Sequence, residues 1–356
     1  MIKLVFFLLL FMFTAVCSFG QTVSNVDAYQ EGKNIIITYD TDMDGIVGDV
    51  YCSIDGGYTW SAALRQVTGD VNKHVPAGSH RIVWDVLAEC ERLAGVNICF
   101  KVVANSGKFM VNGVSFEMVR VEGGTFRMGA TSEQQRDAYK DEKPVHTVTL
   151  SGYYIGKTVV TQALWQAVMG SNPSNFKGAD LPVECVSWDD CQEFIQKLNS
   201  LTGRNFRLPT EAEWEFACRG GNNSRGYKYS GRNKLGSVAW YNGNSGGKTH
   251  SVGTFLWGGF SAPTGDSGSK THPVGTKTPN ELGIYDMSGS VWEWCNDWYG
   301  SYTANSQANP TGPQSGSGRV RRGGSWFNDA RSCRSSNRNG NYPPDRCNFL
   351  GLRLAL

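Results

Sequence analysis

The second half of the chain lacks the regular spacing of apolar residues that defines helices and strands. After about residue 220, glycine, asparagine, serine and tryptophan dominate, and only short strands such as "SVWEWCNDWY" (290–299) are predicted. Most of this half is therefore expected to be irregular chain with few regular elements.

Three helices are predicted ahead of this irregular region, each from its terminal signals. The first spans 161–170 and the second 187–203, with a threonine or serine as N-cap and a glycine as the stop. The third begins at Thr210, which forms a capping box with Glu213 three residues later.

The N-terminal part is predicted to be all-β. Short runs of β-forming residues alternate with clusters of glycine, aspartate and proline, which are typical of turns. These runs lie at 34–40, 49–55, 79–86 and 97–104. A small β-sandwich of the immunoglobulin or fibronectin kind is predicted over residues 21–105. We expect a linker at 106–113 and a second domain over 114–356.

The first twenty residues, 1–20, are predicted to be a secretory signal peptide. One lysine is followed by an apolar run and then by small residues, which is the layout that a signal peptidase requires. The mature protein is therefore expected in the periplasm or at the cell surface, and no other stretch is predicted to cross a membrane. Lipidation at Cys17 is the alternative, although Val16 is larger than a lipoprotein signal prefers.

Whole-chain composition is that of a globular protein. Of the 356 residues, 40% are hydrophobic and 19% are charged, which suits one large and one small domain. The net charge of +2 gives no reason to expect nucleic acid as a partner. Nine cysteines follow the leader, and an odd number at irregular spacing is poor evidence for a disulfide framework.

Seven motifs carry a resemblance to a known family. They are "GGTFRMG", "DEKPVHTVTLSGYYIGKTVVT", "LPVECVSWDDCQEF", "RLPTEAEWEFACRGG", "NELGIYDMSGSVWEW", "RRGGSW" and "LGLRLAL". In this order they resemble the sulfatase-modifying-factor family, which includes the formylglycine-generating enzyme. The resemblance covers about residues 114–356. It implies an α+β fold, the formylglycine-generating-enzyme variant of the C-type lectin fold, with long loops fixed by tryptophans and glycines.

The same resemblance implies where an oxidase site would lie. The family's enzyme binds copper(I) through two cysteines, spaced C-x4-C shortly after "GGS", because soft thiolates suit that ion. Here the first cysteine is missing, Cys333 comes too late in the segment, and Cys347 follows fourteen residues further on. The family's disulfide is not expected either, since Cys218 matches one partner while Leu354 stands at the other. No copper is expected, and the missing cysteine favours a protein that is not an enzyme.

A calcium site is a second implication of the resemblance. In "DMSGSVWE" the family binds calcium through a side chain, two backbone carbonyls and a glutamate, and hard oxygen ligands suit that ion. Here the ligands would be Asp286, the carbonyls of Gly289 and Val291, and Glu293. The alternative is that Asp286 and Glu293 hydrogen-bond turn amides without any metal.

The segment 327–349, called the C-terminal segment below, has a restricted composition. Each of its ten residue types can be encoded by codons that end in a pyrimidine, whereas the absent Lys, Glu, Gln, Met and Trp cannot. This pattern resembles the variable proteins of diversity-generating retroelements, in which adenine positions are rewritten near the end of a C-type-lectin-type domain. Drift in an asparagine-rich loop is the alternative.

The C-terminal segment is predicted to bind a protein or glycan ligand. Exposed loop residues can vary without loss of the core, and aromatic residues mixed with small polar ones suit an adaptable binding surface. The expected contact residues are Phe327, Asn328, Asp329, Ser332, Ser335, Asn337, Asn339, Asn341, Tyr342, Asp345, Asn348 and Phe349.

Arginine is unusually frequent around this segment. Residues 319–353 hold eight arginines, no lysine and, as acids, only Asp329 and Asp345. We expect these arginines to donate to loop carbonyls, since a guanidinium can satisfy several acceptors, rather than to form a nucleic-acid patch.

Two other functions remain open from the sequence. One is a copper-dependent formylglycine-generating oxidase that converts a sulfatase cysteine. The other is a structural subunit of a cell-envelope secretion machine, a use for which some family members are known.

Overall fold

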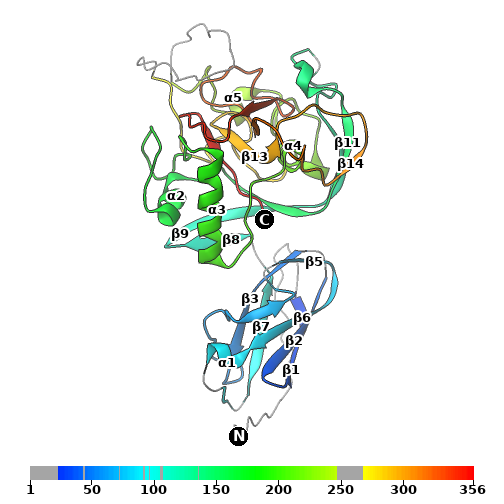
Figure 1. The fold of residues 1–356 in the computed structure, drawn as a ribbon, viewed down its shortest axis with the longest axis vertical. Coiled ribbons are helices and arrows are strands. Elements are labelled where there is room, and N and C mark those ends of the chain that lie inside the picture. The colour runs from blue at the N-terminus through cyan, green and yellow to red at the C-terminus, as the bar shows by residue number, and fades with distance from the viewer. Residues whose placement is uncertain are drawn as a thin grey trace. The chain divides into compact units, whose positions relative to one another are not determined.

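The structure, a computed structural model, divides into two compact units, unit 1 (Met1–Ser106) and unit 2 (Gly107–Leu356) (Figure 1). It describes residues 23–42, 45–71, 73–90, 93–95, 97–104, 107–134, 136–246 and 268–356. The predicted signal peptide and Cys17 lie outside these residues. Within them, no helix is both long enough and apolar enough to cross a membrane.

The described residues of unit 1 form two sheets and one short helix. In spatial order the first sheet has β1 (Val23–Glu31), β2 (Asn34–Thr41), β6 (Gly78–Asp85) and β4 (Val67–Gly69). The second has β5 (Lys73–Val75), β3 (Gly45–Ser53) and β7 (Cys99–Ala104). Helix α1 (Val86–Glu89) follows β6. The four strands predicted from the sequence correspond to β2, β3, β6 and β7.

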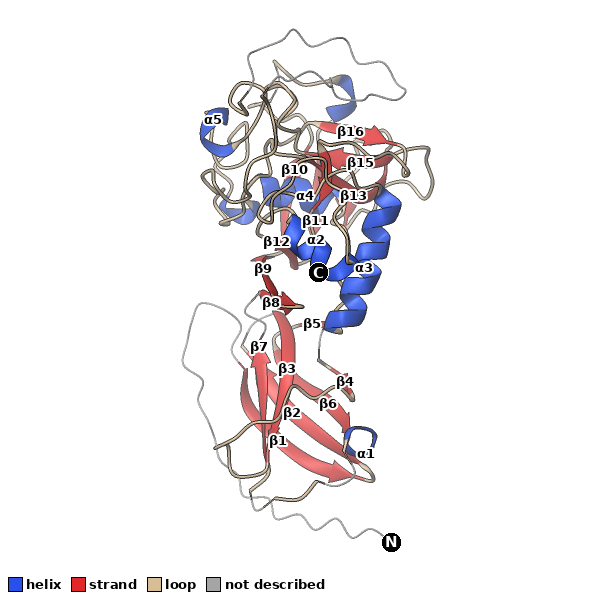
Figure 2. Cartoon of the chain, turned by 90° about the vertical axis from the view of Figure 1, so that its left-hand side faces the viewer, coloured by secondary structure: helices blue, strands red, loops and turns tan. Residues whose placement is uncertain are grey.

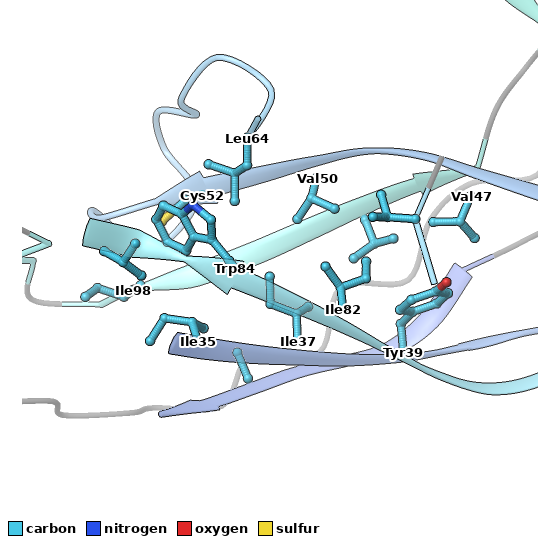
Figure 3. Close-up of a cluster of buried hydrophobic side chains, with 14 of the residues drawn as sticks. Ile35, Ile37, Tyr39, Val47, Val50, Cys52, Leu64, Ile82, Trp84 and Ile98 are labelled. Carbon is cyan, nitrogen blue, oxygen red and sulfur yellow. The ribbon is translucent and has the colours of Figure 1, made fainter. Parts of the chain in front are cut away.

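One apolar cluster joins the two sheets of unit 1. Ile35 and Ile37 of β2 and Trp84 of β6 pack with Val50 and Cys52 of β3 (Figure 3). All five are at least nine-tenths buried. Ile35 and Ile37 are two residues apart along β2 and therefore share this face, because successive side chains of a strand point to opposite sides.

The predicted linker at 106–113 is wrong. Strand β8 (Lys108–Val111) occupies half of it and forms a hairpin with β9 (Val114–Val121), so unit 2 begins at Gly107 rather than at residue 114. Phe109 and Val111 are buried. Asn112 and Gly113 make the turn with φ of 46° and 82°, and an Asn-Gly pair with positive φ at both positions is a strong hairpin signal.

Unit 2 is an α+β fold with few helices, as predicted. The helices are α2 (Gln162–Met169), α3 (Trp188–Thr202), α4 (Glu211–Cys218) and the short α5 (Leu235–Val238), with 3-10 turns at Lys140–Glu142 and Gly221–Asn223. The three predicted helices are confirmed with their N-caps, and the capping box of Thr210 and Glu213 is present. Irregular loops connect the remaining elements of this unit (Figure 2).

Three small sheets complete unit 2. The first contains β10 (Gly124–Met128), β11 (His146–Leu150) and β14 (Gln307–Ala308); the second contains β12 (Tyr153–Gly156), β9 and β8. The third has the order β16 (Arg338–Asn341), β15 (Arg319–Arg322), β13 (Trp292–Trp298) and β17 (Leu350–Leu352). This last sheet carries the C-terminal segment.

Candidate functional site

The C-terminal segment is anchored to the third sheet of unit 2 at several points. It begins shortly after β15, contains β16 and ends one residue before β17. Strand β16 pairs with β15, so that Asn339 faces Arg321 and Asn341 faces Arg319. The backbone of the segment is therefore fixed by a sheet even though its composition is that of a loop.

A buried ion pair fixes the middle of the segment. The guanidinium of Arg334 binds the carboxylate of Glu142 with both Nη atoms, at 2.5 and 2.7 Å, and both side chains are fully buried. Ser336 donates its hydroxyl to the same carboxylate at 2.5 Å. Burial would raise the pKa of Glu142, but these donors outweigh it and hold that pKa below the usual range.

Three more arginines pair with buried carboxylates in the same way. Arg338 makes two bonds to Glu211, at 2.6 and 2.7 Å. Arg322 pairs with Glu215, and Arg353 with Glu293 at 2.7 and 2.9 Å. Helix α4 supplies both Glu211 and Glu215, so the "RLPTEAEWEF" motif is the counter-charge for the arginine-rich end of the chain.

The predicted role of these arginines as donors to loop carbonyls is confirmed. Arg322 donates to the carbonyl of Asn337, Arg338 to that of Gly300 and Arg353 to that of Tyr285. The carboxylates that neutralise them were not predicted from the sequence. The available signal was the excess of arginine over acid in 319–353, because buried guanidinium groups need counter-charges from elsewhere in the chain.

The twelve predicted contact residues fall into three groups by exposure. Asp329 and Tyr342 are exposed. Those partly exposed are Phe327, Ser332, Asn339, Asn341, Asp345 and Asn348. Those buried are Asn328, Ser335, Asn337 and Phe349.

The expectation of exposure is wrong for the four buried residues. The Oδ1 atom of Asn328 accepts hydrogen bonds from the indole of Trp292, at 2.8 Å, and from the hydroxyl of Ser325, at 2.6 Å. The carbonyls of Ser335 and Asn337 accept from Arg322. Phe349 stacks on Phe327 with ring centroids 6.2 Å apart. These residues hold the segment together and are not available to a ligand.

Two further residues of the segment, both arginines, are exposed and were not predicted as contact residues. The guanidinium of Arg331 lies 3.7 Å from the ring centroid of Tyr139 and donates to the carbonyl of Asp137 at 2.7 Å. Arg346 makes two bonds of 2.7 Å to Asp190 at the start of α3. The exposed surface therefore combines cations, carboxylates, amides and aromatic rings.

The cysteine geometry does not resemble a paired thiolate site. Cys333 is buried, its thiol donates to the carbonyl of Asp329 at 3.4 Å, and burial raises its pKa. A C-x4-C pair that ends at Cys333 would need its first cysteine at 328, where the chain has Asn328. Contrary to the expectation above, Cys333 thus fits the second position of such a pair; the first thiol is missing. Among the described cysteines none forms a disulfide.

The residues expected to bind calcium make other contacts. Both oxygens of Glu293 bind the guanidinium of Arg353, and Oε2 also accepts from the indole of Trp214 at 2.6 Å. Asp286 is buried and accepts from the amide of Gly275 at 2.7 Å, while burial raises its pKa to about 6. A cation is disfavoured where a guanidinium already neutralises the carboxylate, so this donor set does not fit calcium.

Comparisons with known proteins agree on unit 2. The family described as sulfatase-modifying factor enzyme 1-like domain matches residues 106–356. Chaperone protein LppX of Paenibacillus barcinonensis is 35% identical, over 71% of this chain and 91% of that protein. Formylglycine-generating enzyme of Mus musculus is 30% identical, over 67% of this chain and 74% of that protein.

A solved structure gives a further comparison. Treponema denticola variable protein 1 matches with a TM-score of 0.57 and 35% sequence identity. The match covers 70% of this chain and 97% of that protein. At this identity the likeness extends to sequence as well as to fold.

Proposed function

The chain belongs to the sulfatase-modifying factor enzyme 1-like family, and we propose that it is a secreted, non-catalytic member that binds a protein or glycan ligand through its C-terminal segment. The observation that carries this proposal is that some residues of the segment are buried while others reach the surface. Arg334, Arg338 and four of its predicted contact residues are buried and bonded, whereas the other eight contact residues reach the surface.

The surface part has the chemistry of an adaptable binding surface. Tyr342 and Phe327 supply aromatic area, while Asn339, Asn341 and Asp329 supply short hydrogen-bonding side chains. Such mixtures bind varied partners at low cost in side-chain entropy. Because β16 and the buried ion pairs hold the backbone, little ordering is needed on binding, which favours affinity.

Sequence diversification of this surface is part of the proposal. The segment lacks the five residue types that pyrimidine-ending codons cannot encode, and the chain resembles a solved structure named a variable protein. A neighbouring reverse-transcriptase gene, with a near-copy of the last hundred or so bases that differs only at adenines, would support diversification. The absence of both the reverse-transcriptase gene and the near-copy from the neighbouring genome would count against diversification.

The remaining parts of the chain fit the same function. We take unit 1 as an immunoglobulin- or fibronectin-like sandwich that spaces the binding unit, after export through the signal peptide predicted at 1–20. A protein ligand is compatible with the relative named a chaperone, since a chaperone also acts by binding another protein.

The binding proposal is tested with two displayed libraries of the mature chain. The first varies only the surface residues Phe327, Asp329, Ser332, Asn339, Asn341, Tyr342, Asp345 and Asn348. It is sorted against panels of extracellular proteins and glycans, and we expect binders of differing sequence that remain folded. The matched library varies only the buried residues Asn328, Ser335, Asn337 and Phe349, and we expect most of its members to be unfolded. Equal folding in both libraries, or no binder from the first, would overturn the proposal.

The oxidase alternative has a direct test. The protein is incubated with a Cys-x-Pro-x-Arg peptide, copper and oxygen, and loss of the peptide thiol is followed by mass. We expect no turnover, because Asn328 occupies the position of a required thiolate. The Asn328→Cys variant restores the C-x4-C spacing and serves as the matched comparison. Turnover by the unaltered chain would replace binding with catalysis.

A further inference from the structure

We propose that Cys185 and Cys347 are an oxidisable pair that forms a disulfide bond, which ties the C-terminal segment to the loop ahead of α3. This inference goes beyond the proposed function and does not require a ligand. Four side chains make up the site: Glu184 interacts with the thiol of Cys185, and Arg321 interacts with that of Cys347.

The two cysteines lie on chain segments that run side by side. The amide of Cys185 donates to the carbonyl of Cys347 at 3.0 Å, and the amide of Trp188 donates to the carbonyl of Pro343 at 2.9 Å. The Asp190–Arg346 ion pair adds a further contact between the same two segments. The segments are thus antiparallel and in register at the two cysteines.

This register is compatible with the distance requirement of a disulfide. With an N–O separation of 3.0 Å, standard backbone bond lengths place the two α-carbons within roughly 7 Å of each other. Disulfides in proteins span about 4.4–6.8 Å between α-carbons. Both cysteines are partly exposed, whereas Cys191, Cys218 and Cys295 are buried. A disulfide-bearing oxidant can therefore reach this pair more readily than those three thiols.

A buried carboxylate lies beside the first thiol. Glu184 is fully buried, and its Oε1 accepts from the amide of Phe176 at 2.8 Å. Its Oε2 makes no hydrogen bond of good geometry to any residue that the structure describes. Burial, and then the Glu184 carboxylate, raise the pKa of Cys185 to about 12. Burial also raises the pKa of Glu184, which makes this carboxylate a better proton acceptor.

A buried guanidinium lies beside the second thiol. Arg321 is only 5% exposed, and neither its Nε nor its Nη1 has a partner in the described part of the chain. It packs against the ring of Trp292, with its Cζ atom 4.6 Å from the ring centroid. Burial raises the pKa of Cys347, and the charge of Arg321 opposes that rise. An adjacent cation favours the thiolate, which is the reactive form.

The proposed pair gives a chemical role to the Oε2 atom of Glu184, whose carboxylate lies within hydrogen-bonding reach of the Cys185 thiol, and to the two unpartnered nitrogens of Arg321. Buried polar atoms are nearly always hydrogen-bonded, so exceptions need an explanation. Here one exception neighbours each thiol, and their charges suit the two halves of a disulfide exchange. Arg321 favours the Cys347 thiolate, and Glu184 receives the proton of Cys185.

The reaction proceeds in two exchanges with an external disulfide such as glutathione disulfide. The Cys347 thiolate attacks one sulfur of that disulfide, whose S–S bond breaks and releases one thiolate. Cys185 then passes its proton to Glu184 and attacks the sulfur of Cys347, so that the Cys185–Cys347 bond forms and the mixed disulfide breaks. The second thiolate leaves with the proton from Glu184. Two protein thiols lose two electrons, and the external disulfide gains them.

The test is a disulfide map of the full mature chain. The reduced protein is treated with glutathione disulfide, quenched in acid, alkylated and digested without reductant, and the peptides are identified by mass. We expect one linked peptide that joins Cys185 to Cys347. Recovery of both cysteines as alkylated thiols, or their linkage to other cysteines, would overturn the proposal. The Cys99→Ser variant, which removes a partly exposed cysteine of unit 1, should leave the linked peptide unchanged.

Two further variants test the positioning residues. In Glu184→Gln the second exchange should slow by at least about tenfold, so that the Cys347–glutathione adduct accumulates before closure. In Arg321→Met the adduct itself should form more slowly, because the cation beside Cys347 is lost. If Glu184 had only a structural role, the adduct would not accumulate in Glu184→Gln. Unchanged rates of adduct formation and closure in both variants would show that neither residue takes part in the reaction. The disulfide itself would still be tested by the peptide map.

Discussion

Unit 1 and the C-terminal part of unit 2 are both built on sheets and both contain an apolar cluster, yet their ion pairs are placed differently. Between the sheets of unit 1 lies an apolar cluster, and its ion pairs Lys33–Asp85 and Arg81–Glu31 lie at the surface. In unit 2 the strands β15 and β16 carry Arg322 and Arg338, both buried and paired with carboxylates. Sequence that lacks hydrophobic periodicity can therefore still specify an interior, provided that its charges are matched.

The difference follows from how much backbone each region leaves unpaired. Strands satisfy their amides and carbonyls through sheet ladders, whereas long loops do not, and buried carbonyls need donors. An arginine offers five N–H groups in a fixed plane, so one side chain can satisfy a carboxylate and a carbonyl together. Arg338 does so with Glu211 and the carbonyl of Gly300.

The largest expected effect comes from breaking one buried pair in unit 2. Arg334→Leu leaves the carboxylate of Glu142 buried without its guanidinium, and such a loss costs about 3–5 kcal/mol. We expect the free energy of unfolding of unit 2 to fall by that amount in urea titrations. Hydrogen exchange would assign the loss to this unit.

The double variant Arg334→Met with Glu142→Met is the control for that experiment. Replacing both partners by apolar residues removes the uncompensated charge, so it should recover much of the stability. If the single variant lost less than about 1 kcal/mol, the buried pairs would not be what holds this region together.

An apolar truncation in unit 1 gives the matching measurement for the other interior. Ile37 is fully buried in the cluster, and Ile37→Ala should cost about 3 kcal/mol through lost burial and a cavity. By contrast Arg81→Met, which breaks a surface ion pair, should change the free energy of unfolding by less than about 1 kcal/mol. A large loss from Arg81→Met would remove the contrast between the two units.

Buried acids should also make unit 2 sensitive to pH. Burial, and then the neighbouring Glu211 carboxylate, raise the pKa of Asp297 to about 7. Between about pH 4 and pH 7 the folded state thus holds a proton that the unfolded state has released, so stability falls as pH rises through this window. The fall is on the order of 2–3 kcal/mol from pH 5 to pH 7.

Asp297→Asn should remove most of this slope in melting temperatures measured from pH 6 to pH 8, because Asp286, whose pKa burial raises to about 6, contributes mainly below that range. The amide oxygen of Asn can still accept the Glu211 amide hydrogen bond, which Asp297 accepts at 3.0 Å, so the helix start keeps its partner. The exposed substitution Asp329→Asn should leave the slope as it is. A slope that persists in Asp297→Asn would place its origin in another group.

The parts of the fold that could be predicted from the sequence are those with local signals. Caps at Thr161, Ser187 and Thr210 locate the helices within a residue, because capping depends on neighbours three positions away. The β8–β9 hairpin also had a local signal, Asn112-Gly113, and was missed because the stretch was assigned to a linker.

The candidate site could be located from the sequence but not divided into buried and exposed residues. Arg334 and Glu142 are 192 residues apart, so no local pattern joins them. Residue types encoded by pyrimidine-ending codons indicate which positions could vary. They carry no information on which way a side chain points. Asn328 and Asn348 are alike in residue type, yet one is buried and the other reaches the surface.

These two asparagines give the smallest and most specific test of the division. Asn328→Ala removes the acceptor of the Trp292 indole and should cost about 1–3 kcal/mol, because a buried donor loses its partner. Asn348→Ala should change the free energy of unfolding by less than about 0.5 kcal/mol, since surface substitutions rarely do more. Both are measured by urea unfolding of the mature chain. Equal losses would mean that the segment has no part free to vary, and a ligand surface would then have to be sought elsewhere in unit 2.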